Sequence, residues 1–353
     1  MSAGVNPAVF DGHNDVLLKL HQAGGLSVSE SFVTGRDGAI DVPSAKTGGF
    51  GGGFFAVYVP SPMDLDFKFE EMTKDSYDLP LQDPIDWEDA FPVVMAQAAI
   101  LFDLEKRGAL TVCRRAAEIR ETILAGKIAA IFHIEGAEAI DPDFHTLDVL
   151  YQSGLRSIGP VWSRTTIFGH GVPFRYPSTG DIGPGLTDHG LRLVKRCDEM
   201  NIMLDLSHLN EAGFWDVARY STKPLVVTHS NVHAICPHSR NLTDAQLAAI
   251  RESDGMVGLN FAVAFLRDDG KMLPDVPLDQ MLRHLDHMIE HLGEDRVGFG
   301  SDYDGAIVPE ALTSCAGLHE LRHAMARHGY DHALMTKLCH GNWLRVLEKT
   351  WGS

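Results

Sequence analysis

Histidine and carboxylate side chains follow apolar segments that have the length of buried β-strands. The first such segment ends in His13 and Asp15, which are separated by one residue. Because strand side chains alternate between two faces, both residues would project to the same side. An imidazole and a carboxylate that converge in this way suit a divalent cation such as zinc. The pair alone also fits a hydrogen-bonded pair on the protein surface.

Glu135, His208 and His229 continue this pattern, because each follows a later apolar run within two residues. A single histidine in such a place is usually a core residue with its hydrogen bonds satisfied. Two histidines at the ends of successive runs indicate a shared role, and neutral imidazole is the commonest metal ligand in proteins. Glu135 could bridge two cations or, if its segment is read alone, cap a helix or form an ion pair.

Asp302 is the first acidic residue after the last apolar run, Val297–Gly300. Its carboxylate is suited to take a proton from a metal-bound water and then to donate it. The residues predict two cations, the first bound by His13, Asp15 and Glu135 and the second by Glu135, His208 and His229. A hydroxide between them would be the nucleophile, since paired cations lower the pKa of bound water. No Gly-x-Ser-x-Gly motif is present, so Ser207 and Ser230 are interpreted as neighbours of ligands.

Arg240 follows His229 in the same predicted loop, within His238-Ser239-Arg240-Asn241. A guanidinium at this position could bind a substrate carboxylate with two parallel hydrogen bonds. A surface ion pair is the alternative role for this arginine.

Eight apolar runs alternate with amphipathic segments along the chain, and they favour a (β/α)8 TIM barrel of the metal-dependent hydrolase type, with active-site loops at the carboxyl ends of the strands. The predicted strands are Val9–His13, Phe54–Val59, Ile128–His133, Leu155–Val161, Ile202–Leu206, Leu225–Thr228, Met256–Phe261 and Val297–Gly300. The principal predicted helices are Trp87–Lys106, Ala116–Leu124, Leu186–Met200, Glu211–Tyr220, Asp244–Arg251 and Leu278–His291. An open doubly wound sheet is the alternative, but no Gly-x-Gly-x-x-Gly follows the first strand.

The whole chain, residues 1–353, is predicted to form one barrel domain with two insertions. The insertion near 60–84 is acidic and interrupted by proline, and the insertion near 165–185 is rich in glycine, proline and aromatic residues. The second is expected to wall or cover the pocket. His133 is expected to face the outside of the barrel and to have a structural role.

Composition excludes several classes of partner. Lysine and arginine number 30 against 48 aspartates and glutamates, so the formal charge is −18. This charge argues against a nucleic-acid backbone or an anionic membrane surface. The five widely spaced cysteines are typical of buried fillers in a reducing compartment. With neither a signal peptide nor a hydrophobic anchor recognisable, a cytoplasmic enzyme without a membrane anchor is expected.

The motifs in this order resemble the membrane (renal) dipeptidase family of zinc peptidases, within the amidohydrolase superfamily. They are Asp11-Gly-His-Asn-Asp15, Ile134-Glu-Gly136, Asp205-Leu-Ser-His208, Thr228-His-Ser230, Ser239-Arg-Asn241 and Gly298-Phe-Gly-Ser-Asp-Tyr-Asp-Gly305. The closing Gly341-Asn-Trp-Leu-Arg345 is similar to the family's C-terminal helix. The resemblance spans nearly the whole chain, and the motifs together are highly specific.

The resemblance implies a barrel with two zinc ions that hydrolyses dipeptides, of the L-Xaa-D-Xaa as well as the L-L type. It assigns one zinc to His13 and Asp15, the bridge to Glu135, and the other zinc to His208 and His229. It also makes Asp302 the catalytic acid and base, and Arg240 the anchor for the terminal carboxylate of the dipeptide. A homodimer is expected on general grounds alone.

One position departs from the family pattern. The family often has a histidine after the fourth strand that contacts the scissile carbonyl, whereas Trp162 stands there in this chain. An indole N–H donates one hydrogen bond but does not titrate, so Trp162 is predicted to contact the substrate and to alter its range. His170 could replace the histidine, although a structural role is favoured.

Two other functions are compatible with the same residues. The first is a related binuclear-metal hydrolase of another amide, lactam or ester, with Trp162 and the 165–185 loop reshaping the pocket. The second is a metal-stabilised binding protein, which would have no need of Asp302 beside a complete set of ligands.

Overall fold

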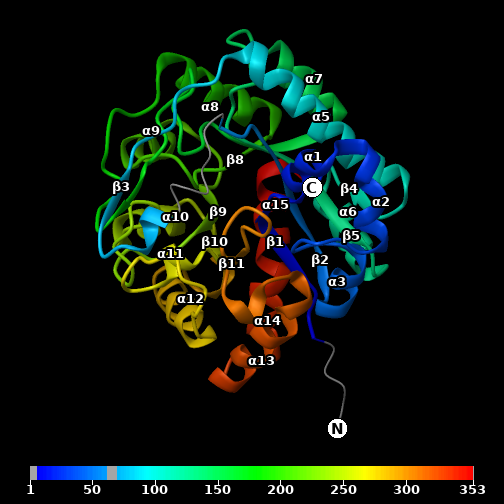
Figure 1. Cartoon of the computed structure of the whole chain (residues 1–353). Coiled ribbons are helices and arrows are strands. Elements are labelled where there is room, and N and C mark those ends of the chain that lie inside the picture. The colour runs from blue at the N-terminus through cyan, green and yellow to red at the C-terminus, as the bar shows by residue number, and fades with distance from the viewer. Residues whose placement is uncertain (1–5, 62–69, 353) are drawn as a thin grey trace.

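Eight parallel strands form a nearly closed barrel at the centre of the protein, surrounded by helices (Figure 1). The computed structural model describes residues 6–61 and 70–352. The barrel strands are β1 (Val9–Asn14), β2 (Phe50–Tyr58), β5 (Ile128–Glu135), β6 (Leu155–Gly159), β8 (Met203–Leu204), β9 (Val226–Ser230), β10 (Met256–Asn260) and β11 (Val297–Gly300). Their spatial order is β8-β6-β5-β2-β1-β11-β10-β9, and each neighbouring pair is parallel. The predicted fold class is confirmed.

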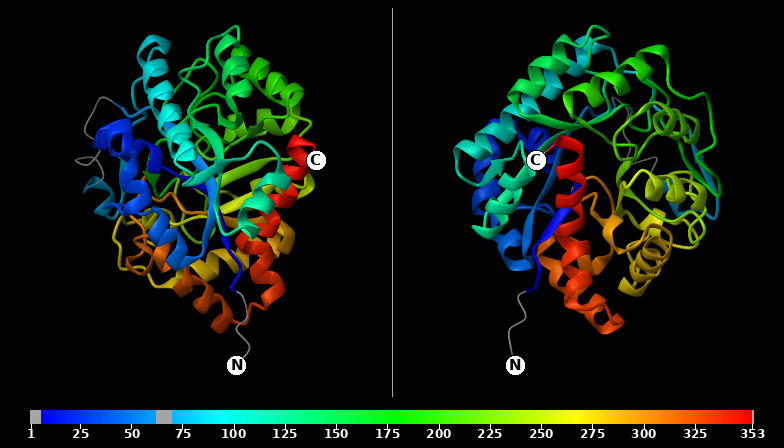
Figure 2. Two further views of the ribbon diagram at one scale, coloured as in Figure 1. Left: turned by 90° about the vertical axis from the view of Figure 1, so that its right-hand side faces the viewer. Right: turned by 180° about the vertical axis from the view of Figure 1, so that it is seen from behind.

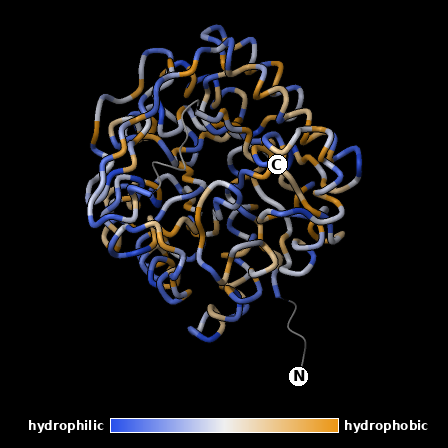
Figure 3. The backbone as a smooth tube through the Cα atoms, viewed as in Figure 1, coloured by the Kyte–Doolittle hydropathy of each residue, from blue (hydrophilic) through white to orange (hydrophobic). Residues whose placement is uncertain are grey.

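Strands β8 and β9 are the two ends of the sheet, and few backbone hydrogen bonds join them to close the barrel. Among the described residues, one parallel bridge joins Asp205 to Val226, and the Leu206 N–H donates to the Val226 carbonyl over 3.0 Å. All residues of the barrel strands are buried except Arg156, which is partly exposed. This pattern follows from the apolar composition of the strands (Figure 3), since strands covered on both faces need no alternation of polar residues.

Helices form the outer layer (Figure 2). The longer ones are α1 (Val16–Ala23), α5 (Trp87–Lys106), α6 (Ala116–Leu124), α7 (His145–Ser153), α8 (Asp188–Met200), α9 (Glu211–Tyr220), α10 (Asp244–Glu252), α12 (Leu278–Leu292), α13 (Leu318–His328) and α15 (Asn342–Trp351). The predicted bounds of α5, α6 and α9 are confirmed, and those of α8, α10 and α12 differ by one or two residues. A short strand, β4 (Leu110–Val112), pairs with β5 and was not predicted.

The C-terminal helix α15 closes the amino-terminal end of the barrel. Its Trp343 is fully buried against Phe10 and Phe54, and its indole N–H donates to the Phe299 carbonyl over 3.0 Å. Close packing here requires glycine on β1, because a Cβ at Gly12 would lie 2.5 Å from the Trp343 ring. The interior of this end is therefore filled with side chains, which leaves the opposite end for chemistry.

The two predicted insertions meet at that opposite end. Strand β3 (Tyr77–Leu79) comes from the first insertion and β7 (Phe174–Tyr176) from the second, and they pair in antiparallel fashion. Residues 62–69 of the first insertion lie outside the described residues. In the described ranges, no helix combines the length and the apolar character that crossing a membrane requires.

Candidate metal centre

The carboxyl ends of four barrel strands bring His13, Asp15, Glu135, His208 and His229 into one cluster. His13 Nε2 lies 3.3 Å from Asp15 Oδ2 and 3.6 Å from Glu135 Oε2. The other oxygen of Glu135, Oε1, lies 3.1 Å from His208 Nε2 and 3.5 Å from His229 Nε2. Glu135 therefore stands between two groups of side chains, one facing each of its oxygens.

Hydrogen bonds outside the cluster orient its histidines. Thr228 donates its hydroxyl hydrogen to Asp205 Oδ2 over 2.6 Å, so this hydroxyl accepts from His229 Nδ1, which is 2.8 Å away. This arrangement leaves His229 Nε2 with a lone pair, which is the form that binds a metal. Ser163 Oγ lies within hydrogen-bond distance of His208 Nδ1, at 3.0 Å, and orients that ring.

Burial changes the pKa of each of these groups. It lowers the pKa of His208 and of His229 well below the usual value, so both rings are neutral near pH 7. Burial raises the pKa of Glu135 well above its usual value, and the neighbouring Asp15 carboxylate adds to this effect. For His13, burial lowers the pKa, but the adjacent Glu135 and Asp15 carboxylates outweigh it and the net direction is upward.

These observations fit a pair of cations. His208 Nε2 and His229 Nε2 lie only 3.1 Å apart, and the lone pair of His229 faces the Glu135 carboxylate. Within the described residues, neither ring nitrogen of His13 has a hydrogen-bond partner, although the ring is fully buried. Lone pairs and carboxylates facing one another in a buried space are stabilised by positive charge, which divalent cations would supply.

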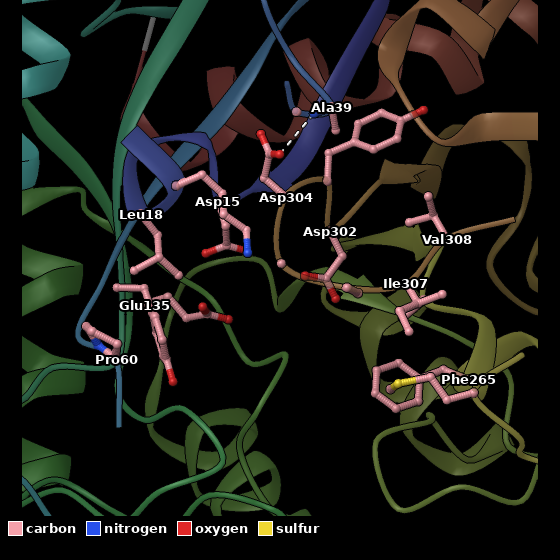
Figure 4. Close-up of a pocket in the computed structure, with 18 of the residues that line it drawn as sticks. Asp15, Leu18, Ala39, Pro60, Glu135, Phe265, Asp302, Asp304, Ile307 and Val308 are labelled. Carbon is pink, nitrogen blue, oxygen red and sulfur yellow. Dashed lines mark hydrogen bonds between the residues drawn. The ribbon is translucent and has the colours of Figure 1, made fainter. Parts of the chain in front are cut away.

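Asp302 lies beside this cluster, at the end of β11. Its backbone has a φ of 59°, and its N–H donates to the His13 carbonyl over 3.0 Å. Its Oδ2 accepts a hydrogen bond from Asn260 Nδ2 over 3.0 Å, and burial raises its pKa. The carboxylates of Asp15, Glu135 and Asp302 face a common space (Figure 4). That space is part of a cavity of about 1000 Å³ at the carboxyl ends of the strands.

Arg240 is buried beneath the histidines and does not line the described part of this cavity. Its guanidinium donates to the main-chain carbonyl of Ser207, and its second terminal nitrogen donates to that of His229 over 3.2 Å. Among the described residues, its Nε has no hydrogen-bond partner. Burial lowers the pKa of Arg240 to about 10, so the side chain stays charged at neutral pH.

Trp162 forms part of the cavity wall, as its predicted contact with substrate requires. Its ring packs edge-on against Tyr58 and Phe174 at centroid distances of 5.1 and 5.7 Å, and it also lies 5.7 Å from the His208 ring. His170 does not line the described cavity; its Nδ1 lies 3.4 Å from Thr165 Oγ1. The structure thus places Trp162, rather than His170, beside the cluster.

His133 is not where the sequence analysis placed it. It lies two residues before Glu135 on β5, so both side chains project to the same side. Its ring is fully buried inside the barrel, 5.7 Å from the His13 ring, and its Nδ1 lies 2.9 Å from Ser157 Oγ. The expectation that it faces outward is therefore wrong.

The sequence did not predict that Asn260, Ser163 and Thr228 orient members of the cluster, although Thr228 belongs to one of the motifs that carry the family resemblance. Asn260 ends strand β10, so the rule that identified the other residues at strand ends could have found it. Ser163 and Thr228 carry no comparable signal, because short hydroxyl side chains near strand ends are common.

Comparisons with known proteins agree with this architecture. The sequence pattern of membrane dipeptidases, peptidase family M19, matches residues 5–351. A metallopeptidase from Rhodobacter sphaeroides, solved with a phosphinate mimic of the dipeptide L-Ala-D-Ala, is 53% identical with a TM-score of 0.96, and the match covers 98% of this chain and 100% of the other. A dipeptidase AC structure of family M19 is 52% identical with a TM-score of 0.96, covering 99% and 100% of the two chains.

A Klebsiella pneumoniae protein described as uncharacterised, from the 5′ region of pqqA, is 45% identical over 271 residues, which are 76% of this chain and 98% of its own length. The family match covers nearly the whole sequence, and the solved relatives share the complete barrel. The chain therefore belongs to the membrane dipeptidase family, peptidase family M19, and is an enzyme of the metallo-dipeptidase type.

Proposed function

We propose that this enzyme is a zinc-dependent dipeptidase with two zinc ions per chain. His13 and Asp15 would hold one zinc, His208 and His229 would hold the other, and Glu135 would contribute one carboxylate oxygen to each. The observation that carries this proposal is the position of Glu135, which has its two carboxylate oxygens within 3.6 Å of three different histidines. Imidazole and carboxylate ligands suit zinc, and the ordering of His229 by Thr228 is the outer-shell support that zinc sites use.

When bound, the two zinc ions supply an activated water and offset the negative charge that develops on the scissile carbonyl. Asp302 accepts the proton of the attacking water and returns it to the nitrogen of the leaving amine. Asn260 holds Oδ2 of this carboxylate, which leaves Oδ1 for the proton. Burial raises the pKa of Asp302, which makes this carboxylate a stronger base for the proton of the attacking water.

The substrate is a free dipeptide, and the positive charge of Arg240 supports this choice. Arg240 keeps its charge beneath the cluster and binds the terminal carboxylate of the dipeptide, for which its guanidinium must release a main-chain carbonyl. Trp162 and Tyr58 form an aromatic wall that restricts the size of the side chains beside the scissile bond. The proposed substrates include dipeptides with a D-residue at the second position, because the Rhodobacter sphaeroides relative binds a mimic of L-Ala-D-Ala.

The test uses zinc-loaded enzyme and a panel of free dipeptides that contains L-Ala-L-Ala, L-Ala-D-Ala and D-Ala-L-Ala. We expect hydrolysis of the first two, and a loss of roughly 10²- to 10⁴-fold in kcat for Asp302→Asn. Zinc content measured in parallel should stay the same in the variant. Enzyme that holds two zinc ions and is inert toward the whole panel would overturn the proposal.

A further inference from the structure

A second group of potential metal ligands lies on the outside of the barrel, where α10 packs against α12 (Figure 1). It consists of Asp244, in the first turn of α10, and of His287 and His291 on α12. One ligand atom from each residue lies within 4.8 Å of the other two. None of the three lines the described cavity, so this group is separate from the barrel centre.

The two histidines are neighbours on the outer face of α12. They are four residues apart, which places them one above the other on a helix, and their rings stack at 4.1 Å with an angle of 12° between them. The side chain of His287 is 21% exposed and that of His291 is 30% exposed, so an ion from solvent can reach both. His284, on the inner face of the same helix, is fully buried and forms hydrogen bonds through both ring nitrogens.

The hydrogen bonds of the pair prepare it for a cation. His291 Nδ1 donates to the His287 carbonyl over 2.9 Å, which leaves Nε2 as the ring nitrogen available to a metal. This nitrogen faces Asp244 Oδ2 at 3.8 Å, beyond hydrogen-bond distance. His287 Nε2 donates a hydrogen bond to the other carboxylate oxygen over 2.8 Å. A cation would take the place of the proton in that hydrogen bond and would bring His291 Nε2 and Oδ2 into the same coordination sphere.

We propose that Asp244, His287 and His291 form a third metal site, which takes a borderline divalent cation such as zinc. Two imidazoles and one carboxylate suit this class of ion, and ligand bonds of about 2.0–2.2 Å need only small rotations of surface side chains. The remaining coordination position is open to water. The ion would join α10, which follows β9, to α12, which follows β10 and the short helix α11 (Val263–Leu266). It would stabilise the outer layer of the barrel, because it binds the folded chain alone.

The experiment measures zinc per chain in the full-length holoenzyme by mass spectrometry after equilibration at buffered free zinc. His287→Ala/His291→Ala is compared with the wild type and with His319→Ala/His323→Ala. The control pair is also spaced by four residues, on α13, with rings 5.9 Å apart, and within the described chain it is not part of a group of three ligands. We expect three zinc ions in the wild type and the control, and two in the first variant. Crystals grown with zinc should show an anomalous peak between Asp244 and the two rings.

Asp244→Asn keeps the shape of the carboxylate side chain, and it replaces the double variant if that variant does not fold. It should lower the affinity of the third zinc at least tenfold without a change in dipeptide hydrolysis. The proposal is overturned if the wild type binds only two zinc ions, if the α12 variants retain the third, or if the control pair loses it equally.

Discussion

Asn260 donates its Nδ2 hydrogen to Oδ2 of Asp302 across 3.0 Å, which joins the ends of β10 and β11 beside the metal ligands. This bond stabilises the charged form of Asp302 and lowers its pKa against the larger effect of burial. Asn260→Ala should therefore reduce kcat about tenfold, the lower end of the effects known for partners of this kind. It should also move the acid limb of the kcat/KM profile to higher pH. An unchanged profile with normal zinc content would contradict this role.

Glu135→Gln keeps the size of the bridging side chain but removes its charge. Because Glu135 faces both groups of ligands, we expect the zinc content to fall at both positions and activity to be lost. His13→Ala should weaken one position more than the other. Mass spectrometry of the purified variants checks this, with chelated wild type restored by added zinc as the control. A Glu135→Gln enzyme that keeps two zinc ions would exclude a bridging role.

Arg240→Met tests whether the guanidinium binds the substrate or only the main chain. If the guanidinium binds the substrate carboxylate, its loss should lower kcat/KM for free dipeptides by roughly 10- to 100-fold. This is the effect expected for a charged hydrogen bond worth about 1.5–3 kcal/mol. Dipeptides amidated at the C-terminus should be poor substrates of the wild type and should be little affected by the change. If both substrate classes lose the same factor, the arginine acts only by supporting the Ser207 and His229 carbonyls.

Glu138 and Arg164 form a buried ion pair next to the cavity, with Glu138 Oε1 2.8 Å from the guanidinium. Arg164 is fully buried, so Glu138→Ala leaves a charge without compensation. We expect the free energy of unfolding to fall by about 3–5 kcal/mol. The double variant Glu138→Ala/Arg164→Met should recover part of that loss in urea denaturation. Equal destabilisation of the single and double variants would show that lost packing, rather than charge, is the cause.

The buried His284 on α12 should make the free energy of unfolding depend on pH in the acidic range. Burial lowers its pKa to about 4, against about 6.5 in the unfolded chain, despite the nearby Asp268 carboxylate. Between these pH values the unfolded chain binds a proton that the folded chain does not. The contribution of neutral His284 to the free energy of unfolding is therefore complete above pH 6.5 and is lost as the pH falls toward 4. This loss amounts to roughly 3 kcal/mol. Urea denaturation from pH 4 to 7 should be less pH-dependent in His284→Gln, and the difference separates His284 from acid release of metal.

Most of the site and of the barrel could be predicted from the residues at the ends of the strands. The apolar runs before His208 and His229 identified their strands, and the rule that active sites occupy one end of a parallel barrel placed these distant residues together. The helix beginning at Trp87 was predicted with its bounds because its amphipathic pattern is long and regular. Such features depend on local sequence, which is why they could be read without coordinates.

The parts that could not be predicted depend on contacts between distant segments. The strand β4 is three residues long and exists because β5 offers an edge for pairing. The hydrogen bonds of Arg240 to main-chain carbonyls depend on how the β9 loop folds back beneath the histidines. The error on His133 had a different origin, because the two-residue repeat already placed it on the side of Glu135.

The pairing of β3 with β7 has a consequence for altering substrate choice by exchanging loops. Phe174, which lines the cavity, stands opposite Leu79, and Arg175 forms an ion pair with Asp78 over 2.8 Å. The two insertions therefore form one paired structure at the edge of the cavity, although about a hundred residues separate them along the chain. If only the segment around Phe174 is taken from a relative, and the segment around Leu79 is not, the graft replaces one strand of a pair whose side chains fit each other. Chimeras should therefore exchange both insertions together.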